Sequence, residues 1–256
     1  MSDRRIGHRI VRLVSAGSTM DEAARLATAG AADGSVVVAS AQTAGRGRAG
    51  RAWHAPAGSA LFCSIVLRPT VPHARLSLLP LIAGERVATV IEQMAGLPCR
   101  LKWPNDVWLN GDGRKVAGLL MTARTATDSV EQAILGIGIN VNSAIADLPP
   151  GATSMASEAG RLFDLDALLT DLLTALDTSY HAFLAAPNDD WIAGWRARAV
   201  YLNEPVSITI DDRRQTGIMR GVDDDGALLL ETPAGDLTRI VAGDLVRGPV
   251  TSGRSR

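Results

Sequence analysis

Glycine and arginine alternate along residues 42–51, which read Q-T-A-G-R-G-R-A-G-R and contain no large apolar side chain. Such a segment cannot form part of a core, so we expect a loop that is mobile until it wraps around an anionic ligand. Glycine lets the backbone approach a ligand closely, and guanidinium groups offer a fork of donors suited to carboxylate or phosphate. The apolar residues 35–40 and 60–67 on either side predict two buried strands. The loop therefore connects two strands of a sheet.

The same glycines, Gly45, Gly47 and Gly50, also match the G-x-G-x-x-G pattern of dinucleotide-binding turns. That pattern requires the glycines to open a helix directly after a strand. Here residues 53–58, W-H-A-P-A-G, would stop a helix, so this interpretation is excluded. Taken alone, the loop is also compatible with a solvated turn that binds nothing.

The composition is that of a soluble globular protein, because 46% of the 256 residues are hydrophobic. With 26 basic and 27 acidic residues the net charge is −1, so no overall field favours nucleic acid or a membrane. No window approaches the ~18 apolar residues of a membrane span, and the first residues lack an apolar signal segment. We therefore expect a cytoplasmic protein. Cys63 and Cys99 lack metal-ligand spacing and are expected to be reduced thiols.

The remaining apolar patterns predict an α/β arrangement. Ser18 and Thr19 precede an alanine-rich helix over residues 21–29, which ends at Gly30. Trp191 and Trp195 are expected to share a face of a short helix. The other predicted elements are helices over residues 74–94, 165–185 and 190–199, strands over residues 9–14, 114–121 and 130–139, two short strands around residues 100–108, and a hairpin turn at residues 110–113.

Polar residues interrupt this framework at two places. Residues 102–106, K-W-P-N-D, hold charged and amide groups on a turn stiffened by proline. Lys115 opens an otherwise apolar strand that contains Gly118, and the next strand contains Gly138 and ends near Asn140. Glycine within a strand often marks the close approach of another group, so these two strands are expected to be neighbours that share a ligand. The alternatives are an ordinary hairpin corner and a lysine that extends into solvent.

Beyond Asn203 the pattern changes to short alternating strands, expected at residues 206–210, 216–220, 227–231 and 237–241. Turns at each junction predict a small β-barrel appended to the α/β domain. The acidic residues 223–225 resemble a calcium loop. Glu231 falls one position short of the required register and no helices flank it, so calcium binding is excluded.

Four motifs together resemble the biotin-protein ligase family: G-R-G-R-A-G-R at residues 45–51, K-W-P-N-D at residues 102–106, R-K-V-A-G at residues 114–118 and G-I-G-I-N at residues 136–140. The resemblance implies an α/β (α+β) fold with a mixed sheet and flanking helices, similar to class II aminoacyl-tRNA synthetases, over residues 1–202. It further implies a small C-terminal SH3-like β-barrel over residues 203–248 and a flexible tail over residues 249–256. Because the chain starts at the catalytic domain, we expect a monofunctional ligase without an N-terminal DNA-binding domain.

The resemblance implies ATP-dependent attachment of biotin to a lysine of biotin carboxyl carrier domains in biotin-dependent carboxylases. Biotin's carboxylate attacks the α-phosphate of ATP, giving biotinyl-5′-AMP and pyrophosphate, and the acceptor lysine then attacks the mixed anhydride. ATP, Mg²⁺ and biotin are the implied cofactors and substrate. The implied protein is a cytoplasmic monomer or homodimer that binds neither nucleic acid nor a membrane. Both steps develop negative charge, so fixed cations are expected.

The resemblance also implies roles for individual residues. Lys115, Arg48 and Lys102 are the implied catalytic residues, and Asp106 is the candidate Mg²⁺ ligand. The implied biotin-binding residues are Ser18, Thr19, Met20, Gln42, Gly45, Arg46, Gly47, Arg48, Trp53, Lys115 and Gly118. The implied ATP- and adenylate-binding residues are Arg46, Arg48, Arg51, Trp53, Asn105, Asp106, Lys115, Gly138 and Asn140.

Two positions depart from the family pattern. Met20 stands where asparagine is usual, and Thr122 where a glutamate commonly ends the lysine strand. Neither change removes a charge that the chemistry requires. A lipoate-protein ligase shares the fold but not these motifs, and a nucleic-acid-binding module would need a basic face that the composition lacks. Pyrophosphate release that depends on biotin and not on lipoate discriminates among the three.

Overall fold

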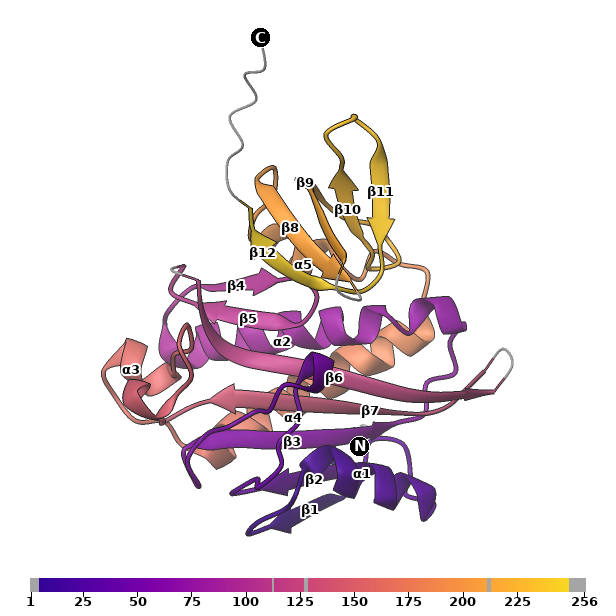
Figure 1. Ribbon diagram of the computed structural model, residues 1–256. Helices are drawn as coiled ribbons and strands as arrows, with labels where there is room; N and C mark the ends of the chain where they lie inside the picture. The colour runs from indigo at the N-terminus through magenta and orange to yellow at the C-terminus, as the bar shows by residue number, and fades with distance from the viewer. Residues whose placement is uncertain (1–4, 112, 127–128, 211–212, 249–256) are drawn as a thin grey trace.

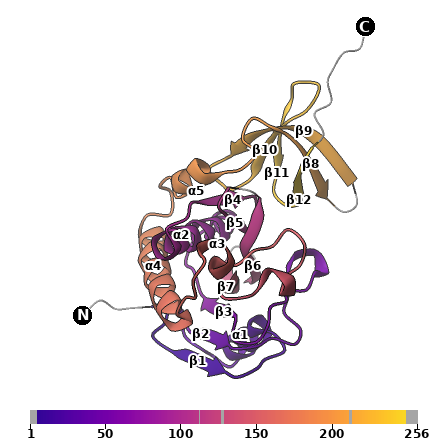
Figure 2. The same ribbon diagram turned by 90° about the vertical axis from the view of Figure 1, so that its left-hand side faces the viewer.

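The computed structural model describes residues 5–111, 113–126, 129–210 and 213–248 (Figure 1). The predicted tail at residues 249–256, Asp112 of the expected hairpin turn and the turn residues 211–212 lie outside these ranges. Figures 1 and 2 show a larger unit built on a seven-stranded sheet and, above it, a smaller unit built on a five-stranded sheet.

The larger sheet is mixed, with strand order β1-β2-β3-β7-β6-β5-β4. β1 runs parallel to β2, and every other neighbouring pair is antiparallel. The expected mixed sheet is thus confirmed, and the two glycine-bearing strands are neighbours with Gly118 opposite Gly138. Its strands are β1 (Ile10–Leu13), β2 (Val36–Ala39), β3 (Ala60–Leu67), β4 (Cys99–Lys102), β5 (Asp106–Leu109), β6 (Arg114–Ala126) and β7 (Ser129–Asn140).

Some of the helix ends carry capping residues. Ser18 caps the first helix by accepting a hydrogen bond from the Met20 N–H, Asp164 caps the long fourth helix, and Gly96 ends the second with φ 70°. The helices are α1 (Thr19–Thr28), α2 (Leu78–Ala95), α3 (Met155–Ala159), α4 (Leu165–Ala185) and α5 (Ala193–Arg198).

The helix predictions were right for α4, and α1 and α2 differ from the predicted bounds only at their ends. The helix predicted over residues 190–199 was partly wrong. It starts at Ala193, so Trp191 precedes it and packs edge-on against Phe183 at 5.9 Å, while Trp195 is buried within α5. The two tryptophans therefore do not share a helical face. α3 was not predicted, because its 5 residues are too few to show a periodic pattern.

Helices cover both faces of the sheet, which explains why β2 and β3 are buried along their whole length. Side chains alternate between the faces of a strand. Val36 and Val38 belong to the large core that α2 and α4 share, whereas Val37 and Val66 pack with residues of α1. Uninterrupted apolar strands are typical of such two-sided burial.

The smaller sheet is antiparallel throughout, with order β11-β10-β9-β8-β12, and it confirms the predicted all-β C-terminal unit. Its apolar side chains belong to the same core as α2. The indole N–H of Trp103 donates to the Gly226 carbonyl at 3.0 Å, and a Cβ at Gly226 would lie 2.9 Å from Leu81. The small unit is therefore packed against α2 and the segment that follows β4. The strands are β8 (Pro205–Ile210), β9 (Arg213–Val222), β10 (Leu228–Glu231), β11 (Leu237–Ile240) and β12 (Asp244–Arg247).

The acidic run at residues 223–225 forms a hydrogen-bonded turn. The Asp223 carboxylate accepts the N–H groups of Asp225 and Ala227 and forms an ion pair with Arg239. Among the described residues, no group of three or more histidine, cysteine, aspartate or glutamate side chains is placed to hold a metal ion. Within the same part of the chain, no helix is long and apolar enough to cross a membrane.

Candidate active site

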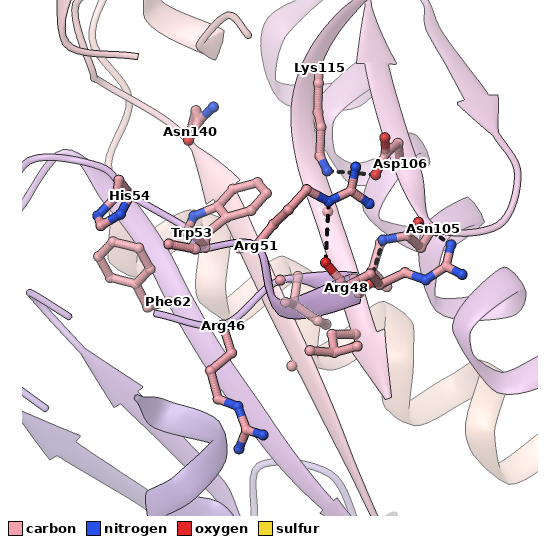
Figure 3. A pocket seen from close by; sticks show the side chains of 18 of the residues that line it. Arg46, Arg48, Arg51, Trp53, His54, Phe62, Asn105, Asp106, Lys115 and Asn140 are labelled. Carbon is pink, nitrogen blue, oxygen red and sulfur yellow. Dashed lines mark hydrogen bonds and ion pairs between the residues drawn. The ribbon is translucent and has the colours of Figure 1, made fainter. Parts of the chain in front are cut away.

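A cavity of about 270 Å³ lies on the α1 face of the larger sheet, between α1, the loop of residues 42–51 and strands β6 and β7 (Figure 3). It unites residues from all four sequence motifs. Of the predicted site residues, Ser18, Thr19, Met20, Gln42, Arg46, Gly47, Arg48, Arg51, Trp53, Asn105, Asp106, Lys115, Gly118, Gly138 and Asn140 line it, whereas Gly45 and Lys102 do not.

Gly45 and Lys102 lie beside the cavity. A Cβ at Gly45 would be 2.4 Å from the carbonyl oxygen of Trp53, so this glycine lets the loop fold back on itself. The Lys102 ammonium lies 5.5 Å from the centre of the Trp108 ring. Burial lowers the pKa of Lys102 below its ordinary value, and the nearby Asp106 carboxylate opposes that shift.

Hydrogen bonds and ion pairs connect the loop of residues 42–51 to its surroundings. Arg48–Gly50 forms one 3₁₀ turn, and the Gly47 N–H donates to the Arg51 carbonyl at 2.7 Å. No long helix follows the glycines, in agreement with the exclusion of a dinucleotide-binding turn. Each arginine meets an acceptor on a different element: Arg46 pairs with Asp21 of α1, Arg48 with Asn105 at 3.3 Å, and Arg51 with Asp244 of β12 at 2.8 Å.

One end of the cavity is cationic. Lys115 Nζ lies 2.6 Å from Asp106 Oδ1 and 5.2 Å from the centre of the Trp53 ring (Figure 3). The Arg48 guanidinium lies at the same end. Burial lowers the pKa of Arg48 below its ordinary value, while the carboxylates of Asp244 and Asp106 raise it. Asp106 is the one carboxylate among the described lining residues, so an anionic ligand enters a region of excess positive charge.

The floor of the cavity is made of glycine. A Cβ at Gly118 would lie 2.8 Å from the Trp53 ring, and one at Gly138 would lie 2.6 Å from it, so the indole rests directly on the two strands. Gly136 makes room for Met20 in the same way, at 2.7 Å. Met20 is 6% exposed and contributes an apolar wall in place of the polar contact that asparagine would offer.

The opposite end of the cavity is polar and uncharged. Ser18 uses its hydroxyl to cap α1. Gln42 Oε1 accepts two hydrogen bonds from Thr19, one from the backbone N–H at 2.7 Å and one from the hydroxyl at 3.1 Å. Because both bonds go to Oε1, the Nε2 group of Gln42 stays available as a donor to a ligand.

Two asparagines of the motifs differ in their contacts. Asn140 is 3% exposed, and its Nδ2 donates to the Thr153 carbonyl at 3.0 Å. Its Oδ1 is buried with no hydrogen-bond partner among the described residues, and the same holds for Trp53 Nε1. Asn105 is already satisfied on both sides, because Nδ2 donates to a carbonyl of β6 and Oδ1 accepts from Arg48. Buried polar atoms without partners are costly, so Asn140 has the character of a ligand-binding group.

Sequence reasoning missed the segment 149–152, which it took for a connecting loop. This segment is fixed to the start of β6, because the Lys115 N–H donates to the Gly151 carbonyl and the Thr153 N–H donates to the Lys115 carbonyl, each at 2.9 Å. Only the proline and glycine residues there hinted at a defined backbone. The other lining residues that were not predicted are Ala52, His54, Phe62, Leu119, Leu120, Gly136 and Ile137.

Comparisons with known proteins give consistent matches. Residues 15–140 match the model of the Biotin/lipoate A/B protein ligase family, and residues 201–248 match that of the Biotin protein ligase C terminal domain. A "Biotin--[acetyl-CoA-carboxylase] ligase" of Paracoccus denitrificans is 37% identical over 226 residues, which cover 85% of this chain and 92% of the relative. The "Bifunctional ligase/repressor BirA" of Bacillus subtilis is 34% identical over 235 residues, which cover 90% of this chain and 71% of the relative.

Solved structures are similar as well. The biotin protein ligase from Aquifex aeolicus in complex with biotin and ATP superposes with a TM-score of 0.80 at 28% identity, over 94% of this chain and 100% of that one. The similarity extends over both sheets of the protein.

Proposed function

Because the chain belongs to the biotin protein ligase family, we propose that the cavity described above is where biotin is activated by ATP and then passed to a lysine of an acceptor protein. The protein is an ATP-dependent ligase that attaches biotin to protein. The assignment of the site rests on one observation: the polarity and charge of the lining residues change from one end of the cavity to the other. A polar, uncharged end at Thr19 and Gln42 is joined by an apolar glycine floor to a cationic end at Lys115 and Arg48.

The groups of biotin follow the same order as these parts of the cavity: a polar, uncharged ring, an aliphatic tail and a carboxylate. Its cyclic urea needs a donor for the carbonyl and acceptors for the N–H groups, and Gln42 and Thr19 offer both. Its aliphatic tail lies beside the Trp53 ring, which itself rests on Gly118 and Gly138. Its carboxylate then reaches Lys115. Arg46 and Gly47 line the cavity between the two ends and contact the bound ligand.

In the first step the biotin carboxylate attacks the α-phosphorus of ATP. A carbon–oxygen–phosphorus link forms, the bond to the β-phosphate breaks, and pyrophosphate leaves with the electron pair. Lys115 exchanges its ion pair with Asp106 for the reacting anions, and Arg48 and Arg51 stabilise the phosphates. Lys102 lies outside the lining, at the end of β4 opposite Asp106 of β5, and adds positive potential from there.

Magnesium is expected because ATP binds as its Mg²⁺ complex. The donor set fits, since Mg²⁺ retains waters and typically uses one or two carboxylates together with phosphate oxygens. Asp106 is the lining carboxylate that would hold it and help to neutralise phosphate charge.

In the second step the acceptor amine attacks the carbonyl carbon of the anhydride, an amide bond forms, and AMP leaves. The acceptor is proposed to be a biotin carboxyl carrier domain of a biotin-dependent carboxylase, in keeping with the Paracoccus relative's name. We further propose that the enzyme works in the cytoplasm as a monomer or homodimer without nucleic acid or membrane, and that residues 1–202 and 203–248 act as catalytic and SH3-like units.

The adenine base is proposed to bind at Asn140. The exocyclic amine of adenine is the donor that the unpartnered Oδ1 lacks. Asn105 contributes by holding Arg48 in place.

The test is pyrophosphate release by the purified protein with biotin or lipoate, followed by transfer to a carrier domain. Release that requires biotin and ATP supports the proposal. Equal release with lipoate contradicts the assignment of the polar end to a cyclic urea, because lipoate has none.

A further inference from the structure

Ser64 contributes a fully buried hydroxyl to the middle of the apolar strand β3. It is 0% exposed and lies outside the cavity lining. Its neighbours Cys63 and Ile65 point into the large core, so the alternation of the strand turns Ser64 toward α1, the side on which the cavity lies. There Ser64 Oγ donates a hydrogen bond to Thr19 Oγ1 at 2.8 Å.

The direction of every hydrogen bond in this cluster follows from one backbone group. The Thr19 N–H can only donate, so the Gln42 atom 2.7 Å away must be the oxygen Oε1. The Thr19 hydroxyl, 3.1 Å from the same oxygen, must donate to it as well. With its proton used, Thr19 Oγ1 can only accept from Ser64. The chain of donors therefore runs in one direction, from Ser64 through Thr19 to Gln42.

This direction decides what the cavity offers to a ligand. Gln42 Oε1 is saturated by Thr19, so the amide must present its Nε2 donor to the cavity. Thr19 Oγ1 keeps one lone pair and presents an acceptor. A neighbouring donor and acceptor match the C=O and N–H groups of a cyclic urea.

We propose that Ser64 is a positioning residue for biotin's ureido ring: by donating to Thr19 Oγ1 it holds the Thr19 hydroxyl in the orientation that the Thr19–Gln42 pair requires. The inference rests on the proposed function, in which the ureido ring binds at this end. Without Ser64, the Thr19 hydroxyl loses a partner and can rotate, so its proton is free to point at the ligand and weaken the match.

The chain supplies a matched control. Ser35 is also buried, at 1% exposed, but its Oγ has no hydrogen-bond partner among the described residues. Ser35→Ala therefore removes a buried hydroxyl without breaking a hydrogen bond. Ser64→Cys serves as the second variant, because it fills the site of the hydroxyl and leaves only a weak donor.

The experiment measures KM for biotin, KM for ATP and kcat in the pyrophosphate-release assay, with melting temperatures to monitor folding. Loss of one hydrogen bond predicts a rise in the biotin KM of about five- to tenfold for Ser64→Ala. Ser64→Cys should show most of that rise, while the KM for ATP and kcat at saturating biotin stay at wild-type values. Ser35→Ala should match wild type in all three. The inference is overturned if Ser64→Ala leaves the biotin KM unchanged. It is also overturned if Ser35→Ala raises the biotin KM as much as Ser64→Ala does, or if Ser64→Ala raises the ATP KM as much as the biotin KM.

Thr19→Val separates this inference from the proposed function. If Ser64 acts through Thr19, Thr19→Val raises the biotin KM, and adding Ser64→Ala to it raises the KM no further. A Thr19→Val variant with wild-type biotin KM contradicts the proposed ureido site itself. If Thr19→Val raises the biotin KM but Ser64→Ala does not, the proposed ureido site stands and only the role of Ser64 is rejected.

Discussion

Arg51 Nη2 lies 2.8 Å from Asp244 Oδ1, so a residue of the loop over the cavity is paired with the first residue of β12 in the small sheet. The side chains are 61% and 39% exposed, and such pairs contribute little to stability. The Asp244 carboxylate also raises the pKa values of Arg48 and Lys102 against the effect of burial. Asp244 thus acts electrostatically on cations in and beside the cavity without lining it.

Asp244→Asn should lower the KM for ATP by about two- to fivefold at low salt, because the carboxylate competes with phosphate for Arg51 and opposes the positive potential. The difference should shrink at high salt, and the melting temperature should stay near that of wild type. Initial rates at two ionic strengths measure this, and a higher KM for ATP in the variant would show that Asp244 positions Arg51 instead.

Lys115→Ala should reduce adenylation by about 10²- to 10³-fold, since a fixed cation at the reacting anions is lost. The fold should persist, because the Lys115 ammonium contacts the Asp106 carboxylate and the Trp53 ring, both of which line the cavity. Arg124→Ala is the matched control: it removes another cation of β6, one that pairs with Glu131 and does not line the cavity. Single-turnover pyrophosphate release is the measurement, and wild-type rates in Lys115→Ala would rule out the catalytic role.

Arg48→Gly should release preformed biotinyl-AMP about 10- to 100-fold faster, the loss expected for a charge-assisted hydrogen bond to the adenylate. Lysines of bystander proteins should then become labelled. Asn105→Ala should act in the same direction more weakly, because it removes the acceptor that holds Arg48 but leaves the guanidinium itself in place. The dissociation rate of radiolabelled biotinyl-AMP decides the matter; a rate equal to that of wild type in Arg48→Gly excludes Arg48 as a retaining contact.

Gly138→Ala should raise the KM for biotin at least tenfold, because the new Cβ would lie 2.6 Å from the Trp53 ring and displace it from the floor. Gly84→Ala in α2 is the contrasting variant. Its Cβ meets nothing closer than 3.7 Å, so the helix should gain about 0.5–1 kcal/mol without a change in activity. Denaturant unfolding tests the stability of Gly84→Ala, and biotin titration tests both variants. A normal biotin KM in Gly138→Ala would mean that biotin does not bind against Trp53.

Asn140→Ala should raise the KM for ATP about tenfold, because adenine loses the acceptor that Oδ1 provides. The preference for ATP over GTP should decrease by a similar factor. In the wild type the guanine carbonyl and Asn140 Oδ1 are both acceptors and repel each other, and the variant removes that repulsion. Competition between the two nucleotides measures the preference directly. An unchanged preference would place the base elsewhere in the cavity.

Much of the fold follows from local patterns in the sequence. The short, mainly apolar run at residues 60–67 predicted a buried strand, and the structure has it as β3 with the same bounds. The leucine stripe of residues 165–185 likewise predicted α4. Period and capping chemistry are local properties, so they determine which segments are helices and strands and which of their faces are buried.

The sequence by itself also determined the chemistry of the site, because the arginine loop, the lysine strand and the glycine strands can be read as separate motifs. Tertiary structure alone decided how they combine. Lys102 stays outside the lining, Asn105 accepts a hydrogen bond from Arg48, and Ser64 of β3 donates to Thr19 of α1. The physical reason is that strand register and the packing of α1 on the sheet bring together residues far apart in the chain. A hydrogen bond between Ser64 and Thr19 depends on both, and neither leaves a mark in the sequence around either residue.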